Sequence, residues 1–315
     1  MTQILRSYLE HLCDKANVEH DVPMKTKTTF RIGGNAKFFV TVKSKSVLLK
    51  LVSALKFIEE PYFVIGLGAN VLACDSGFDG VVIKLGFSEV VQNGHFVYAD
   101  AGATLAKVGA FCKRQGLAGL EWACGVPATV GGAIYMNAGA YGHQMSDSVV
   151  CVDVLINGEV KTLGATKLKL GYRTSIFHKK RGWVVLGAYF HLKPDTQAQI
   201  EKKEAEYRAA RINALPTNPS AGSTFKKPAP NFYVGQVIES LGLKGKQVGD
   251  ARISEKHAGV IINNGSASCK DVLSLVRLIK KKVWASHGVK LELEYTVLKN
   301  PVKLERGKHR KVKAV

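Results

Sequence analysis

The sequence predicts an α+β fold in which helices and strands are intermixed along the chain. Segments with the apolar period of a helix stand among short apolar runs that are typical of strands. The strands do not alternate regularly with helices, as a doubly wound parallel sheet requires. With 315 residues the chain is long enough for about two domains. Its 46% hydrophobic and 22% charged residues exclude a chain that is disordered throughout.

The first third of the chain combines helical and extended patterns. Apolar side chains recur at the helical period in residues 2–13. A second helix is predicted over 46–58, where a serine precedes the apolar positions and can cap the first turn. Short apolar runs at 62–65, 81–85 and 96–101 predict strands.

The middle of the chain is marked by caps and by glycine. Thr104 can cap a helix over 105–115, and Gly116 would end that helix. Residues 125–142 hold too many glycines for a regular helix, so we expect irregular backbone there.

A β-hairpin and a long strand follow. The runs 149–156 and 160–163 flank Asn157-Gly158, a pair that favours the type I′ turn of a tight hairpin. A continuous apolar run predicts a strand over 183–192.

The last third begins with a highly charged helix. Residues 196–212 have a helical composition, and we interpret them as a linker helix between domains. A later helix is predicted over 269–286, begun by Ser268 with Asp271 three residues on, the pattern of a capping box. The remaining elements are a helix near 234–241, a strand at 259–262 and a strand at 290–298.

Cysteine spacing and hydropathy limit the possible classes of protein. The six cysteines occur singly among apolar neighbours and form no CxxC pair, which predicts reduced thiols and no metal site. No apolar run is long enough to span a bilayer, and the first residues lack the apolar block of a signal peptide. We therefore expect a cytoplasmic protein that does not insert into membranes.

The chain carries a large positive charge. Lysine and arginine number 45 against 25 acidic residues, a net charge of +20. Such an excess attracts polyanions, including phosphorylated small molecules. No basic motif is interleaved with aromatic residues, so we expect no specific nucleic-acid partner. A non-catalytic polyanion-binding protein stays an alternative.

Residues 66–70, GLGAN, follow a predicted strand and suggest a nucleotide-binding turn. The Rossmann fingerprint needs a small residue at its sixth position and a helix directly after it, but Val71 stands there. The turn can still offer backbone N–H groups to a diphosphate, with Asn70 as a further polar contact. An ordinary tight loop explains this segment equally well.

The second glycine-rich segment, 125–142, has glycine at positions 125, 131, 132, 139 and 142 with small residues between. Glycine permits positive φ and close approach of a ligand to the backbone. We favour a ligand cradle over a purely structural loop.

Eight segments of the chain, in order, carry a resemblance to a known family. They are TTFRIGGNAKFFV (28–40), GLGANVLACDSGFDGVVIKL (66–85), ADAGATL (99–105), GVPATVGGAIYMNAGAYG (125–142), LGYRTSIF (170–177), NPSAGSTFKKP (218–228), GLKGKQVGDARISEKHAGVIIN (242–263) and HGVKLELE (287–294). With these segments the sequence resembles the UDP-N-acetylenolpyruvoylglucosamine reductase family, in its shorter class. The resemblance spans almost the whole chain, apart from about the first twenty residues and the basic end.

The resemblance implies a two-part FAD-binding domain without a Rossmann fingerprint, plus a smaller α+β substrate-binding domain. The first part is expected at 1–82, joined by a strand returning from 290–302, and the second at 83–196. The substrate-binding domain is expected at 197–289, and 303–315 form a basic tail.

The implied activity is the reduction of UDP-N-acetylglucosamine enolpyruvate to UDP-N-acetylmuramate in peptidoglycan synthesis. The cofactor would be FAD, the reductant NADPH, and the other partner the UDP-sugar. The sequence indicates no oligomeric state. An FAD-dependent oxidase or dehydrogenase of a hydroxy acid or aldonolactone is the alternative. It would share the glycine segments but would not need the YRxS, SAGS and LELE motifs.

The resemblance also implies three catalytic residues. Arg173 matches a cation beside the developing negative charge, and Ser223 matches the proton donor, with Ser220 as second choice. Glu294 matches the third catalytic position. In a strand Glu292 would project to the same face, so the period of the pattern alone does not choose between them.

Binding residues are implied in the same way, with two departures from the family pattern. Ala128 stands where the family often has glycine, and Lys227 stands where it usually has asparagine. Predicted to bind the cofactor are Gly66, Gly68, Ala69, Asn70, Gly102, Gly125, Pro127, Thr129, Gly131, Gly132, Asn137 and Gly139. Predicted to bind the substrate are Tyr172, Lys226, Lys227, Lys256 and His257.

Overall fold

The structure is a computed structural model that describes residues 2–180 and 182–300. The end of the predicted returning strand and the predicted basic tail lie outside the described residues. The helices are α1 (Thr2–Cys13), α2 (Lys45–Phe57), α3 (Leu105–Arg114), α4 (Val130–Met136), α5 (Gln197–Ala214), α6 (Val234–Ser240) and α7 (Cys269–His287). No helix in this part of the chain is long and apolar enough to cross a membrane.

The strands are β1 (Val18–Pro23), β2 (Asn35–Val42), β3 (Tyr62–Ile65), β4 (Val71–Ala73), β5 (Phe78–Leu85), β6 (Val90–Asn93), β7 (Phe96–Asp100), β8 (Leu117–Ala118), β9 (Gly139–Ala140), β10 (His143–Gln144), β11 (Val149–Ile156), β12 (Glu159–Gly164), β13 (Val184–His191), β14 (Lys193–Pro194), β15 (Gln247–Val248), β16 (Ala251–Ile253), β17 (Ile261–Asn263) and β18 (Thr296–Leu298). The intermixed helices and strands confirm the predicted α+β class.

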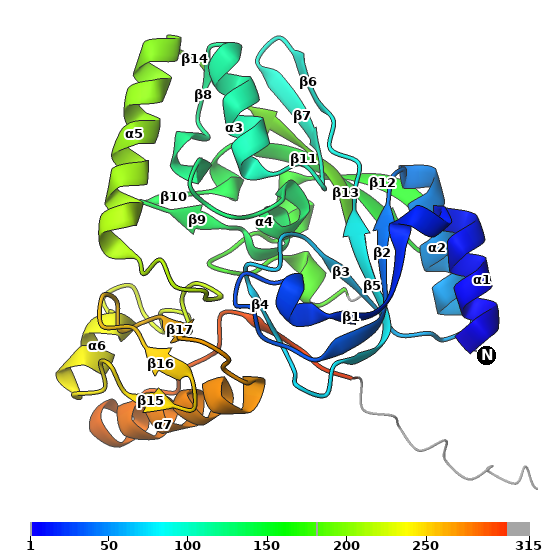
Figure 1. Ribbon diagram of the computed structural model, residues 1–315. Coiled ribbons are helices and arrows are strands. Elements are labelled where there is room, and N and C mark those ends of the chain that lie inside the picture. Colours follow the sequence, from blue (N-terminus) through cyan, green and yellow to red (C-terminus); the bar gives the residue numbers. More distant parts are fainter. Residues whose placement is uncertain (1, 181, 301–315) are drawn as a thin grey trace, which may run out of the picture.

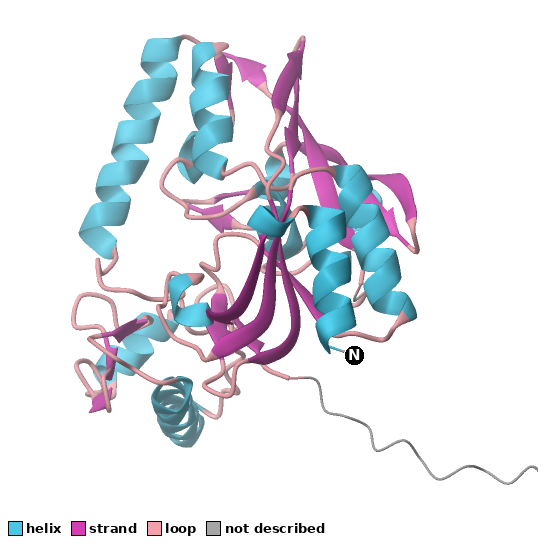
Figure 2. Ribbon diagram, turned by 45° about the vertical axis from the view of Figure 1, so that its right-hand side comes forward, coloured by secondary structure: helices cyan, strands magenta, loops and turns pink. Residues whose placement is uncertain are grey.

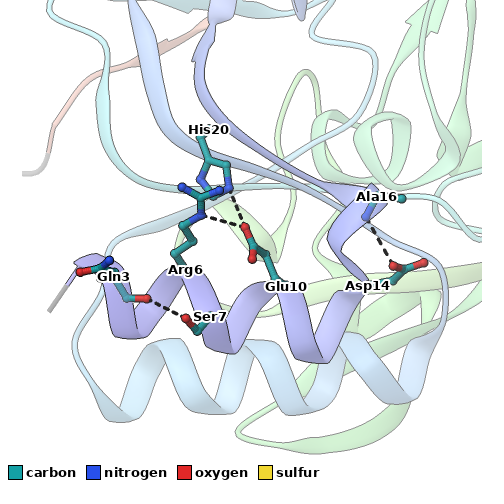
Figure 3. A network of polar contacts seen from close by, with 7 residues as sticks. All are labelled: Gln3, Arg6, Ser7, Glu10, Asp14, Ala16 and His20. Atoms are coloured by element: carbon teal, nitrogen blue, oxygen red, sulfur yellow. Dashed lines mark hydrogen bonds and ion pairs between the residues drawn. The ribbon is translucent and has the colours of Figure 1, made fainter.

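The N-terminal part is built on a four-stranded sheet of order β1-β2-β5-β3, in which β5 runs parallel to both β2 and β3. Helices α1 and α2 lie side by side next to this sheet (Figure 1). Leu5 and Leu9 of α1 are buried in the same core as the apolar face of α2. Glu10 further fixes α1 to β1, since its carboxylate contacts His20 of β1 at 3.1 Å and also accepts one hydrogen bond from Arg6 of α1 at 2.8 Å (Figure 3).

A second, antiparallel sheet has the order β12-β11-β13-β7-β6. The β11–β12 connection confirms the predicted hairpin, because Asn157 (φ 51°) and Gly158 (φ 88°) both have the positive φ of a type I′ turn. The predicted helix after Thr104 is confirmed as α3, whose first turn the threonine caps. Helix α5 runs beside α3, as both ribbon views show (Figure 2).

The C-terminal part is a smaller lobe of α6, α7 and the three-stranded sheet β15-β16-β17 (Figure 1). The predicted capping box of Ser268 and Asp271 begins α7. This lobe shares one apolar core with Phe30, Ile32 and Leu72 of the N-terminal part. The chain then returns, and β18 pairs in parallel with β4.

Two predictions about local structure are wrong. The segment 125–142 does contain a helix, α4, because Thr129 caps it and its glycines at 131 and 132 keep helical backbone. The predicted strand 290–298 is regular only over β18. Before β18 the chain crosses from one lobe to the other, and Leu293 forms a single isolated bridge with Phe225.

Candidate functional site

A cavity of about 2150 Å³ opens between the two larger sheets and the C-terminal lobe. Its walls come from the turn after β3, the segment around the start of α4, the loop 215–223 and the chain that leads into β18. Pockets for a single drug-sized ligand usually measure roughly 300–1,000 Å³. The cavity therefore has room for more than one ligand.

Arg173 and Glu294 meet at this cavity although they are far apart in the sequence. Arg173 Nε donates to Glu294 Oε1 at 2.7 Å, and Arg173 Nη2 donates to the carbonyl of Gly139 at 2.8 Å. The Arg173 backbone is left-handed (φ 52°), a conformation that non-glycine residues seldom adopt. Both side chains are largely buried, with 22% of Arg173 and 13% of Glu294 exposed. The geometry holds the guanidinium in one orientation.

Burial dominates the electrostatics of Glu294. It raises the pKa of this carboxyl above the ordinary value, because the charged form loses its hydration. The neighbouring Arg173, and more weakly Lys226, oppose that rise but do not cancel it. Glu294 consequently keeps its proton to a higher pH than an exposed glutamate.

Ser223 lies in an exposed loop that lines the same cavity. Its neighbour Thr224 is buried and fixed, since the Thr224 amide donates to Gly259 and its hydroxyl accepts from Ile261. The amide of Glu294 donates to the carbonyl of Thr224 at 3.0 Å. Ser223 is thus carried on backbone that is tied directly to Glu294. Within the described chain its hydroxyl has no hydrogen-bond partner.

Glu292 and Glu294 separate in the structure. Glu292 is 74% exposed and pairs with Lys226 Nζ at 2.6 Å, whereas Glu294 turns toward Arg173. The expectation that both project to one face of a strand is wrong, because no strand forms at these positions. Glu294 lines the cavity and Glu292 does not.

The turn 66–70 forms one wall of the cavity. Gly68 has positive φ (67°), and a Cβ there would lie 2.5 Å from the carbonyl oxygen of Lys27. No group in residues 2–180 or 182–300 accepts a hydrogen bond from the amides of Gly68, Ala69 and Asn70. The side chain of Asn70 donates to the carbonyl of Glu294 at 3.3 Å. This turn therefore offers adjacent unpaired donors at the cavity.

The segment 125–142 differs, because most of its amides are already paired within the protein. Gly131 donates to Ala101 and Gly132 donates to Thr129 Oγ1. A Cβ at Gly131 would lie 3.1 Å from the side chain of Ala101, and one at Gly139 would lie 2.4 Å from the carbonyl of His143. At Gly132 the nearest atom would be 3.5 Å away. Only Gly132 among these three leaves ordinary space for a side chain.

Most of the predicted cofactor-binding residues line the cavity. They are Gly66, Gly68, Ala69, Asn70, Gly102, Pro127, Thr129, Gly131, Gly132 and Gly139. Gly125 does not line it, and neither does Asn137, which is fully buried. The Asn137 side chain donates to Gln144 and Gly171 and so fixes the loop before Arg173.

The predicted substrate-binding residues form two groups outside the cavity lining. In the first group the Tyr172 ring lies 5.3 Å from the Arg173 guanidinium, the Tyr172 hydroxyl accepts from the Lys227 amide at 3.2 Å, and Lys226 pairs with Glu292. Lys256 and His257 are engaged elsewhere: Lys256 Nζ donates to Ile212 O at 2.6 Å, and His257 Nδ1 accepts from the Gly259 amide.

Several basic side chains line the cavity although the sequence did not predict them as site residues. Arg31, Lys84 and Arg211 all line it. Arg211 stands near the end of α5, one turn before the loop that leads to Ser223. The net charge of the chain was the available signal, but it does not identify which basic residues face the cavity.

Comparison with known proteins gives matches over nearly the whole chain. A family model described as the C-terminal domain of UDP-N-acetylenolpyruvoylglucosamine reductase matches residues 214–298, and one described as an FAD binding domain matches residues 36–164. The UDP-N-acetylenolpyruvoylglucosamine reductase of Pseudothermotoga lettingae is 41% identical over 90% of this chain and 99% of its own length. The reductase of the same name from Caldanaerobacter subterraneus subsp. tengcongensis is 40% identical over 95% of this chain and 99% of its own length.

A solved structure is similar over a comparable span. The crystal structure of UDP-N-acetylenolpyruvylglucosamine reductase from Thermus caldophilus matches with a TM-score of 0.78 and 36% identity. The match covers 90% of this chain and 99% of that chain.

Proposed function

Because the chain belongs to the UDP-N-acetylenolpyruvoylglucosamine reductase family, we propose that it reduces UDP-N-acetylglucosamine enolpyruvate to UDP-N-acetylmuramate. The chain is an FAD-dependent oxidoreductase of peptidoglycan synthesis, and we assign NADPH as its reductant. Both proposed small-molecule partners carry phosphates, which suits a chain of net charge +20.

The residues at the cavity fit FAD. The adjacent amides of Gly68, Ala69 and Asn70, which have no acceptor among the described residues, form the kind of concave donor set that binds a diphosphate. Gly132 leaves space that a ligand can occupy. When bound, FAD supplies the redox chemistry by passing on a hydride received from NADPH. We assign the remaining wall of its site to Gly66, Gly102, Pro127, Thr129, Gly131 and Gly139.

Arg173 is assigned to the substrate's carboxylate and to the negative charge that develops beside it. A guanidinium has five N–H donors, and the donors on Arg173 Nε and Nη2 contact Glu294 and Gly139. The others can form a fork onto a carboxylate. Because Glu294 and Gly139 fix the guanidinium in place, it is oriented before the substrate arrives.

Ser223 is assigned as the proton donor to the carbon next to the one that accepts the hydride. A serine hydroxyl is a weak acid, so its proton must be delivered to a strongly basic centre. Glu294 lies on backbone tied to the Ser223 loop, and burial favours its neutral form. Its Oε2 is the oxygen that Arg173 does not contact.

The substrate's nucleotide and sugar are assigned to residues outside the cavity lining. Tyr172 lies against Arg173 and contacts the Lys227 amide, and with Lys226 these residues supply two cations and an aromatic ring. Lys256 and His257 stay predictions, as does the division of the chain at 82, 196 and 289. Consistent with such a division, the FAD-binding match ends at 164 and the C-terminal match begins at 214.

One observation carries this proposal. Arg173, Ser223 and Glu294 come from three separate segments, yet all three line one cavity and two of them form a 2.7 Å ion pair. An oxidase of a hydroxy acid would need the glycine walls but not this set of residues.

Flavin absorbance in an anaerobic experiment tests the proposal. Purified protein should be yellow, NADPH should bleach the flavin bands, and UDP-N-acetylglucosamine enolpyruvate should then restore them. A matched sample that receives a hydroxy acid or an aldonolactone in place of NADPH should stay oxidised. Bleaching by the hydroxy acid, or no reoxidation by the enolpyruvyl substrate, would contradict the proposed reaction.

A further inference from the structure

Two cysteines that are distant in the sequence lie together where the two parts of the molecule meet. Cys74 follows β4 in the region matched by the FAD-binding model, and Cys269 begins α7 in the C-terminal lobe. Their Sγ atoms are 3.8 Å apart, and both thiols are free. Among the described residues, the remaining cysteines have no second sulfur in contact.

The backbone on the Cys74 side is fixed. The Cys74 amide donates to Leu298 O at 2.9 Å, which extends the β4–β18 pairing. Its carbonyl accepts from the amides of Gly34 and Gly77, each at 3.0 Å. Cys74 is therefore held within a tight network of backbone hydrogen bonds.

The backbone on the Cys269 side is fixed by Asp75, the residue that follows Cys74. Both carboxylate oxygens of Asp75 accept from the start of α7, from the Cys269 amide at 2.7 Å and from the Lys270 amide at 3.0 Å. The residue after Cys74 thus caps the helix that Cys269 begins. Since a disulfide bond is roughly 2.05 Å long, the sulfurs need to approach by less than about 2 Å. The Asp75 contacts already hold the two backbone segments together at this separation.

The two thiols differ in accessibility. Cys269 is 2% exposed, and burial raises its pKa well above the usual range for a thiol. Cys74 is partly exposed. An oxidant in solution therefore meets Cys74 first, and Cys269 is placed to react with the product.

We propose that Cys74 and Cys269 are an oxidation site at which hydrogen peroxide closes a disulfide between the FAD-binding part and the C-terminal lobe. The Cys74 thiolate attacks peroxide, the O–O bond breaks, and a sulfenic acid forms with release of hydroxide. The Cys269 sulfur then attacks the Cys74 sulfur, the S–O bond breaks, and the thiol proton of Cys269 leaves with the hydroxide as water. The proton that Cys74 lost converts the hydroxide of the first step into the second water. In sum, two thiols and one peroxide give one disulfide and two waters.

The expected consequence is a covalent connection between lobes that are otherwise joined by an apolar core and by hydrogen bonds. The bond closes a loop of nearly 200 residues, counted from positions 74 and 269, which restricts the unfolded chain strongly. The melting temperature should rise by roughly 5 °C or more on oxidation. Reduction with dithiothreitol should reverse that rise.

Peroxide treatment of the native holoprotein tests this site. Remaining thiols are blocked with an alkylating reagent, and unreduced peptides are analysed by mass spectrometry. We expect a Cys74–Cys269 peptide pair that is lighter by two hydrogen atoms than the separate thiol peptides. The pair should be absent in Cys74→Ser and in Cys269→Ser. Cys151→Ser is the matched control, since Cys151 is also partly exposed but has no neighbouring sulfur, and it should keep both the pair and the stabilisation.

Three results would overturn the proposal. One is irreversible oxidation of Cys74 without the crosslinked peptide. Another is a crosslink that leaves the melting temperature unchanged. The third is an equal rise in the melting temperature of the Cys74→Ser protein on peroxide treatment. The wild-type peptide analysis decides the matter even where a variant fails to fold.

Discussion

The two glycine-rich segments line the same cavity, but glycine serves a different purpose in each. In the turn 66–70, Gly68 bends the chain to positive φ and leaves adjacent amides without an acceptor in the described structure. In 125–142 the amides are mostly paired within the protein, and glycines such as Gly131 and Gly139 let other parts of the chain approach. Gly132 alone among the glycines compared here combines helical backbone with open space.

The difference shows what glycine density in a sequence indicates. A missing Cβ permits close approach, but the sequence does not reveal whether the approaching atoms belong to a ligand or to the protein. In the first segment, the donors without an acceptor among the described residues are the basis for the proposed ligand contact. In the second, much of the approach comes from neighbouring backbone and side chains. Substitutions at single glycines can separate these two uses.

The largest effect is expected from Gly68→Ala. A Cβ at this position would lie 2.5 Å from Lys27 O and 2.8 Å from the Thr28 Cα, and φ is 67°. The left-handed backbone alone costs roughly 1–2 kcal/mol for a residue with a Cβ. With the backbone collision we expect a loss of about 3 kcal/mol or more in the free energy of unfolding, together with loss of flavin. Denaturant titration of the purified variant measures it. If Gly68→Ala were as stable as wild type, the backbone of the turn 66–70 would have to differ from the conformation described above.

A smaller and more selective effect is expected from Gly132→Ala. Alanine favours the helix by up to about 1 kcal/mol over glycine, so the apoprotein should be at least as stable as wild type. A Cβ in the space assigned to FAD should weaken flavin binding by roughly tenfold to a hundredfold. Flavin titration and thermal unfolding of the apoprotein test the two halves of this prediction.

Gly131→Ala is the matched control for that experiment. Its Cβ would meet Ala101 at 3.1 Å, so the variant should lose stability as well as flavin. If Gly132→Ala binds flavin as tightly as wild type, the space beside α4 does not belong to the flavin site.

The smallest effect concerns Glu294, which contacts Arg173, the residue that the Gly139 carbonyl helps to orient at the end of the second glycine segment. Burial raises the pKa of Glu294 above 4.5, so the folded protein binds this proton more tightly than the unfolded chain does. The stability contributed by the proton is fully present below about 4.5 and is lost as the pH rises through the folded pKa. A pKa that differs by 1 between the folded and unfolded states corresponds to about 1.4 kcal/mol of stability.

Denaturant unfolding of wild type and Glu294→Gln over a series of pH values measures the contribution of the Glu294 proton to the free energy of unfolding. The stability of wild type relative to the variant should fall as the pH rises through this window. A relative stability that increases with pH would mean that the ion pair with Arg173 outweighs burial.

Much of the fold could be predicted because its signals are local. Thr104, Ser268 with Asp271, and Asn157-Gly158 each act within a few residues, so short patterns predict the helix starts and the hairpin. The resemblance of eight ordered segments likewise predicted Arg173, Ser223 and Glu294, and all three line one cavity.

The remaining features depend on contacts between distant segments. Helix α4 forms in glycine-rich sequence because Thr129 caps it and because Ala101 and Ala103 accept hydrogen bonds at its start. Glu292 and Glu294 diverge because their backbone joins the loop that carries Ser223 rather than a sheet. Neither the Arg173–Glu294 pair nor the position of Arg211 leaves a pattern in nearby sequence.

Ser223 is proposed to donate a proton after the flavin has been reduced. The most direct measurement follows both half-reactions of Ser223→Ala by stopped-flow flavin absorbance, with Ser220→Ala as the matched control, since Ser220 lies in the same loop and also lines the cavity. Reduction by NADPH should proceed at nearly the wild-type rate in both variants. Reoxidation by the enolpyruvyl substrate should slow by about 10²–10⁴-fold in Ser223→Ala only. Reoxidation of Ser223→Ala within a few-fold of wild type, or a large loss in Ser220→Ala instead, would contradict this account.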